Sequence, residues 1–163
     1  MEPVRKIMAA VGSSQYARGT FQYAAGLAKS MNADLIVASV INSRDVAAVR
    51  QVATMGYDID GEHYIEGIRQ ERKCALEEYA VGAELDPKKL RIVFPVGNPI
   101  EELLKLIVQE NVDMVVMGIK GKTDLEHIFI GSVAEKIFRR SPVTVVSYRD
   151  DEMAARLKKR INP

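Results

Sequence analysis

Five short apolar runs, separated by segments of helical period, constrain the fold of this chain more than any other feature. They cover residues 6–11, 34–41, 90–94, 112–117 and 142–147. Their residues are mostly apolar without alternation, which is typical of strands buried on both faces. Strands of this kind alternating with helices predict an α/β fold, with a parallel sheet covered by helices on both sides.

Two of the intervening segments have the periodicity of amphipathic helices. Residues 14–31 repeat apolar side chains at helical spacing, and Ser13 or Ser14 could cap the start of that helix. Residues 62–83 predict a long helix, although Arg72 interrupts its apolar face.

A third helix is predicted from its first residues. Asn98 is a favoured cap, and Pro99 suits the first helical position. By contrast, residues 42–61 contain Gly56 and Gly61, and their apolar residues do not recur at a clear helical or strand period. We interpret them as an excursion from the sheet that is partly helical.

The composition suits one globular domain whose net charge is too small to create a strong electrostatic field. The chain has 163 residues, with 23 Lys and Arg against 22 Asp and Glu, so nothing in the net charge favours nucleic acid or a membrane surface as a partner. A single cysteine, Cys74, excludes an intrachain disulfide and a Cys-rich zinc site. No apolar run approaches the ~20 residues of a membrane span. We expect a cytoplasmic protein with a domain over residues 1–148 and a basic amphipathic tail over residues 149–163.

The loop after the run 112–117 is the most informative segment for function. It contains Gly118 and Gly121, and it leads to Gly131 and Ser132 at the start of a predicted helix. Glycines let the backbone approach a phosphate or adopt positive φ, and a helix start offers amides and a positive dipole to an anion. From the glycines alone, a purely structural role explains the pattern equally well.

The spacing of the four residues over the whole loop resembles a known motif. Gly118-x2-Gly121-x9-Gly131-Ser132, after a buried strand and before a helix and a Pro-Val-Thr-Val-Val strand, is similar to the nucleotide motif of the universal stress protein family. The similarity extends over residues 6–147. It implies a Rossmann-like five-stranded sheet of order 3-2-1-4-5, a homodimer often formed through the last strand, and binding of ATP or AMP, with Mg²⁺ accompanying the triphosphate.

The resemblance also assigns positions. It places Gly118 near the ribose, Gly121, Gly131 and Ser132 around the phosphates, and Val40 against the adenine. The full set of candidate binding residues is Gly12, Ser13, Val40, Gly118, Gly121, Gly131, Ser132 and Val133.

One position departs from the family pattern. The family usually has Asp-Gly-Ser after the first strand, whereas this chain has Gly12-Ser13-Ser14. The missing carboxylate removes a hydrogen-bond acceptor worth about 1.5–3 kcal/mol.

Three functions are compatible with these residues. The first, which we expect, is a regulatory module that binds ATP or AMP and has neither a catalytic constellation nor a protein-built metal site. The second is a slow ATPase or phosphotransferase, for which Asp124 and Glu126 are available carboxylates. The third is a dimeric interaction protein whose nucleotide site has weakened, as the residue at Gly12 suggests.

Overall fold

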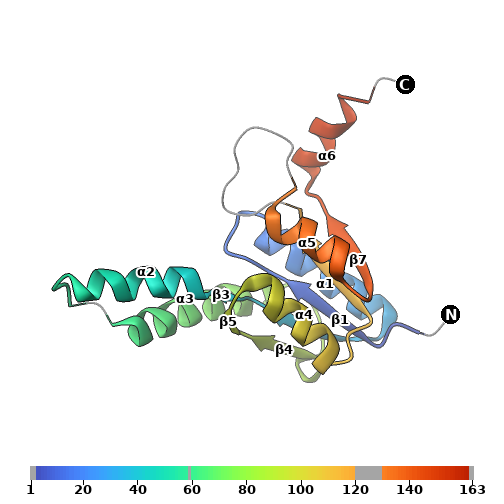
Figure 1. The fold of residues 1–163 in the computed structure, drawn as a ribbon. Helices are drawn as coiled ribbons and strands as arrows, with labels where there is room; N and C mark the ends of the chain where they lie inside the picture. Colours follow the sequence, from blue (N-terminus) through green and yellow to red (C-terminus); the bar gives the residue numbers. More distant parts are fainter. Residues whose placement is uncertain (1–2, 59, 120–129, 162–163) are drawn as a thin grey trace.

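A five-stranded parallel sheet forms the centre of the molecule. The computed structural model describes residues 3–58, 60–119 and 130–161. The strands are ordered β4-β2-β1-β6-β7, and every neighbouring pair is parallel (Figure 1). Their bounds are β1 Lys6–Ala10, β2 Asp34–Ala38, β4 Leu90–Val93, β6 Met114–Gly118 and β7 Thr144–Tyr148. Numbered along the chain, these five strands have the predicted order 3-2-1-4-5.

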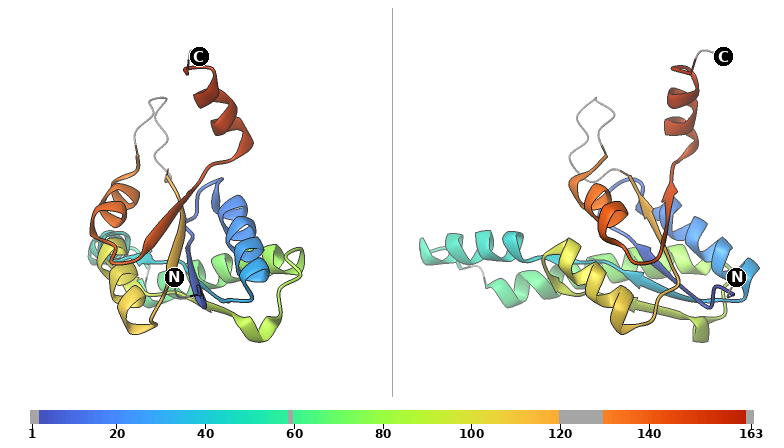
Figure 2. Two further views of the ribbon diagram at one scale, coloured as in Figure 1. Left: turned by 90° about the vertical axis from the view of Figure 1, so that its right-hand side faces the viewer. Right: turned by 45° about the vertical axis from the view of Figure 1, so that its right-hand side comes forward.

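Helices cover both faces of this sheet (Figure 2). One face packs against α1 (Ala17–Met31) and α3 (Gly61–Val81), and the other against α4 (Pro99–Gln109) and α5 (Ser132–Arg140). Successive strand residues serve opposite faces: Ile7 belongs to the first cluster and Met8 to the second, both fully buried. This two-sided burial explains why the strands are continuous apolar runs.

The predicted second strand, residues 34–41, is wrong as a single element. The chain leaves the main sheet after Ala38, and Ile41–Asn42 forms β3, which pairs with β5 (Val96–Gly97) in a separate two-stranded sheet. The amide of Ser39 still donates to the carbonyl oxygen of Val93. Since residues 35–41 are all buried or half-buried, hydrophobicity alone did not reveal the break.

Residues 42–61 are largely helical, as the interpretation of a partly helical excursion anticipated. Helix α2 spans Ser43–Thr54, and the Asn42 side chain caps it by accepting a 3.0 Å hydrogen bond from the amide of Arg44. With the first part of α3, it forms a helical hairpin that extends away from the sheet (Figures 1 and 2). Only Val46 of α2 is fully buried, so the helix has too narrow an apolar stripe to be recognised from its period.

The predicted cap of α1 by Ser13 or Ser14 is wrong. Helix α1 begins at Ala17, its N-cap residue is Tyr16, and no side chain in the described part of the chain forms a cap hydrogen bond with it. The carbonyl oxygen of Ser14 accepts a 3.0 Å hydrogen bond from the amide of Ala17, so a turn precedes the helix. Both serines therefore lie too early in the chain to act as caps.

The C-terminal tail contains helix α6 (Asp151–Lys158). The Asp150 carboxylate caps it by accepting a 2.8 Å hydrogen bond from the amide of Met153. The Met153 side chain is buried against Tyr16 and Ile119, whereas Ile161 is exposed. A short 3-10 helix, η1 (Pro87–Lys89), precedes β4. None of the helices in the described ranges is long and apolar enough to cross a membrane.

Candidate functional site

The strand order reverses between β1 and β6, which is where an open parallel sheet binds ligands. The register aligns Ala10 of β1 with Ala38 of β2 on one side and Met117 of β6 on the other. These three residues stand at or next to the ends of their strands. The candidate residues Gly12, Val40 and Gly118 follow them closely, so all three lie where the strands end. We call this carboxyl end of the sheet the carboxyl edge.

Gly131 and Ser132 form the start of α5 beside this edge. Gly131 is the N-cap residue, with φ −57° and ψ 146°, and no side chain of the described residues caps the helix. The first helical amides of any helix lack partners within it. In α5, no described side chain accepts from the amides that follow Gly131, and the positive end of the helix dipole lies at the same point.

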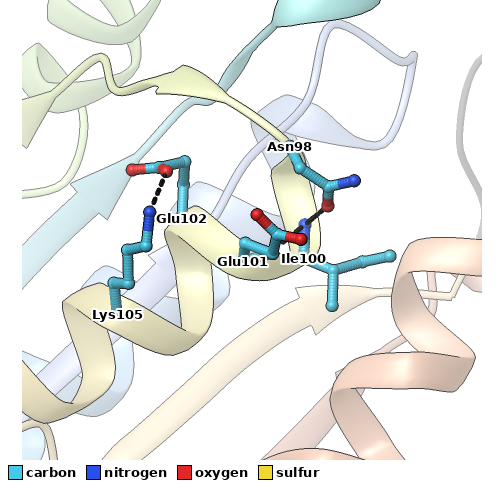
Figure 3. Close-up of polar contacts among 5 residues, drawn as sticks. All are labelled: Asn98, Ile100, Glu101, Glu102 and Lys105. Carbon is cyan, nitrogen blue, oxygen red and sulfur yellow. Dashed lines mark hydrogen bonds and ion pairs between the residues drawn. The ribbon is translucent and has the colours of Figure 1, made fainter.

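Helix α4 shows the opposite arrangement. The Oδ1 atom of Asn98 accepts hydrogen bonds from the amides of Ile100 (3.0 Å) and Glu101 (3.4 Å), as the sequence predicted for this cap (Figure 3). Within the same helix, Lys105 donates a 2.8 Å hydrogen bond to Glu102. The start of α4 thus has a side chain that accepts from its amides, which the start of α5 lacks in the described part of the chain.

Where the structure describes them, the glycines of the motif have backbone dihedral angles that other residues also adopt. Gly118 is the last residue of β6 and aligns with Tyr148, and the φ of Gly131 is open to any residue. Gly121 lies outside the described residues, as do the carboxylates of Asp124 and Glu126.

Gly12 and Ser13 are both exposed at the end of β1. A Cβ atom built on Gly12 would meet no atom within 4 Å, and the φ of Gly12 is not positive. The surroundings therefore leave room for the aspartate that the family usually has at this place. Ser132 is exposed and Val133 half-buried, so both are also near the surface.

Arg72 is the residue at this edge that sequence reasoning missed. Its Nη1 atom donates hydrogen bonds to the carbonyl oxygen of Val40 (2.8 Å) and to Oγ of Ser39 (3.1 Å). Burial disfavours the charged form and lowers the pKa of Arg72 below its ordinary value. A lone arginine four residues before the buried Leu76, on the inner face of α3, was the available signal.

Comparisons with known proteins agree with this architecture. The sequence profile of the Universal stress protein family matches residues 3–149. A protein of Staphylococcus aureus strain USA300 that is named as a universal stress protein is 30% identical over 152 residues, covering 93% of this chain and 87% of its own.

Solved structures have the same fold. A universal stress protein from Archaeoglobus fulgidus in complex with dAMP has a TM-score of 0.63 and 16% identity, covering 91% of this chain and 100% of its own. A universal stress protein in complex with cAMP has a TM-score of 0.62 and 18% identity, covering 91% and 98%. Because the matched residues 3–149 include all five strands of the sheet and the helices that cover it, the chain belongs to the universal stress protein family.

Proposed function

We propose that this protein binds an adenine nucleotide, ATP or AMP, where β1 and β6 end, and that occupancy of this site regulates its contacts in a stress response. The observation that carries the proposal is the start of α5, where no described side chain caps the helix after Gly131. A phosphate at this point accepts hydrogen bonds from the first helical amides and gains from the helix dipole. The cAMP and dAMP held by other family members support the choice of an adenine nucleotide.

The other candidate residues serve the remaining parts of the ligand. In this proposal Gly118 lies against the ribose, Val40 contacts the base, and Gly12 and Ser13 line the edge between them. Among the residues that the structure describes, no three Asp, Glu, His or Cys side chains are grouped to hold a metal ion. In this proposal Mg²⁺ arrives bound to the triphosphate.

Isothermal titration of ATP and AMP in the presence of Mg²⁺ tests the proposal, with Gly131→Asp as the diagnostic variant. Aspartate is a favoured N-cap residue, so its carboxylate takes the amides of α5 and repels phosphate. We expect the wild-type protein to bind, and Gly131→Asp to fold at least as stably without binding.

Gly67→Asp is the matched control. It adds the same charge on the exposed surface of α3, where a Cβ atom meets nothing within 4 Å. It should bind as the wild type does. Absence of binding by the wild type, or equal binding by Gly131→Asp, would overturn the proposal.

The proposal includes a homodimer formed through β7. This strand pairs with β6 on one side and is the last strand of the sheet, so its other edge carries backbone groups that a second copy could pair with. Sedimentation velocity with and without nucleotide measures both the dimer and its dependence on occupancy. A monomer under both conditions would remove this part of the proposal and leave nucleotide binding untouched.

A further inference from the structure

Arg72 brings a positive charge to the base end of the proposed site, and no carboxylate of the described residues is in contact with it. Among the described residues it forms no ion pair within 4.0 Å, and its Nη1 atom donates to two neutral oxygen atoms, Ser39 Oγ and the carbonyl oxygen of Val40. Ser39 is fully buried, so the guanidinium reaches into the interior at this point. Glu71 and Asp45 act on this charge only at longer range, and burial lowers the pKa of Arg72 despite them. A half-buried cation without a carboxylate in direct contact is costly to keep, which suggests a use beyond packing.

The two contacts fix where the guanidinium lies. Ser39 and Val40 connect β2 to β3. The next amide, that of Ile41, donates to the carbonyl oxygen of Pro95. The 2.8 Å hydrogen bond from Arg72 is therefore made to backbone at the carboxyl edge of the sheet, where the ligand is proposed to bind.

This position matters for recognition of the base. The amino group at position 6 of adenine is a hydrogen-bond donor, and a free carbonyl oxygen beside the base is the acceptor that selects it. Arg72 already donates to the carbonyl oxygen of Val40 and so competes with the amino group of a base for its lone pairs. A guanidinium carries five N–H donors and no acceptor, so it suits the oxygen at position 6 of hypoxanthine better than the amino group of adenine.

We infer that Arg72 determines the base specificity of the site, by competing for the carbonyl oxygen of Val40 and admitting 6-oxo purines beside adenine. The inference rests on the proposed function, because it concerns the base end of that same site. The missing carboxylate at Gly12 acts in the same direction, since it removes another acceptor from this edge.

The test compares AMP with inosine monophosphate, which differ at the 6 position of the base. Their dissociation constants are measured by isothermal titration for the wild-type protein and for Arg72→Met, which keeps a long apolar stem and removes every donor. We expect the wild type to bind the two nucleotides within about threefold of each other, and Arg72→Met to prefer AMP by about tenfold, the worth of about one hydrogen bond.

Two further variants separate specificity from packing. Arg72→Lys keeps a cationic donor and should keep the wild-type ratio. Arg69→Met removes an arginine from the same helix whose partner is the exposed Glu66, 2.9 Å away, and should leave the ratio unchanged.

The outcomes are distinct. A wild-type preference for AMP of about tenfold or more overturns the inference by itself, even if Arg72→Met fails to fold. An unchanged ratio in a folded Arg72→Met overturns it as well, since the carbonyl oxygen then serves both donors. Binding of neither nucleotide by the wild type removes the proposed function, and the inference with it.

Discussion

The backbone amide of Gly131 donates a 2.7 Å hydrogen bond to the carbonyl oxygen of Ile119. This bond joins the residue after β6 to the residue before α5, although eleven residues lie between them in the sequence. Gly118 and Ser132, the neighbours of this pair, are thereby held close to one point at the edge of the sheet. The proposed contacts to the ribose and to the phosphates are adjacent for this reason.

Gly12→Asp should strengthen nucleotide binding. The position has room for a side chain, because a Cβ atom meets nothing within 4 Å. A carboxylate that accepts a hydrogen bond from the ribose or base should lower the dissociation constant for AMP at least about tenfold. Isothermal titration measures this, with Gly67→Asp as the control for added charge. Unchanged affinity in a folded variant would show that the carboxylate does not reach the ligand.

Gly19→Ala should destabilise the fold. A Cβ atom at Gly19 would lie 2.4 Å from Oη of Tyr148, whose ring packs against Tyr23 with centroids 5.5 Å apart. Such overpacking costs about 1–3 kcal/mol of unfolding free energy. Urea denaturation measures it.

The control is the same substitution in the same helix. A Cβ atom added at Gly26 of α1 would meet no atom within 4 Å, so Gly26→Ala should stabilise by about 0.5–1 kcal/mol. Equal effects at the two glycines would contradict the steric explanation.

Acid should remove the contribution of the ion pair between Arg91 and Glu110. The hydrogen bond from Arg91 lowers the pKa of Glu110 below its ordinary value of 4.5. A depressed carboxyl pKa stabilises the fold above the unfolded-state pKa, and this stabilisation is lost as the pH falls through the folded-state pKa.

Urea denaturation of the wild type and of Glu110→Gln between neutral pH and pH values below 4.5 measures this loss. The difference between the two should be constant near neutrality and should shrink in acid. High salt should reduce it, because the pair lies at the surface. Glu77→Gln is the control, since its contact with Lys73 is 3.8 Å long. A difference that persists below both pKa values would contradict the assignment.

Met153→Asp should detach α6 while leaving the sheet intact. Met153 is 6% exposed and packs on Tyr16 and Ile119, so a carboxylate there is buried without compensation. Hydrogen exchange should show rapid exchange of the α6 amides and unchanged protection in β1 and β6. Ile161→Asp, at a side chain 71% exposed, should have no such effect. Retained protection of α6 would show that its capping by Asp150 suffices to hold it.

The sheet could be predicted from the sequence because its strands are buried on both faces. Runs such as Ile7 to Ala9 have no polar residue, and the helices between them have clear apolar stripes. Helix α2 was less clear, since Ala47 and Ala48 are exposed and only Val46 is fully buried. It lies against α3, β3 and β5 and not on the main sheet, so the core of that sheet imposes little pattern on its sequence.

The candidate site was predictable only in part. The start of α5 at Ser132 was anticipated from the motif, and no side chain of the described residues caps it. The role of Arg72 was not, because its partners are a carbonyl group and a hydroxyl 32 and 33 residues away in the sequence. Backbone acceptors leave no residue pattern, so a contact of this kind becomes visible only in three dimensions.

The helical hairpin has a consequence for protein engineering. Between α2 and α3 the chain turns at Gly56, which has φ +94° and is exposed, next to Met55 and Tyr57, which are also exposed. Exposed turns between elements are the places where a chain tolerates a second domain. A fluorescent reporter inserted after Gly56 would therefore be carried at the far end of a helical arm, while the main sheet keeps all its strands and their register.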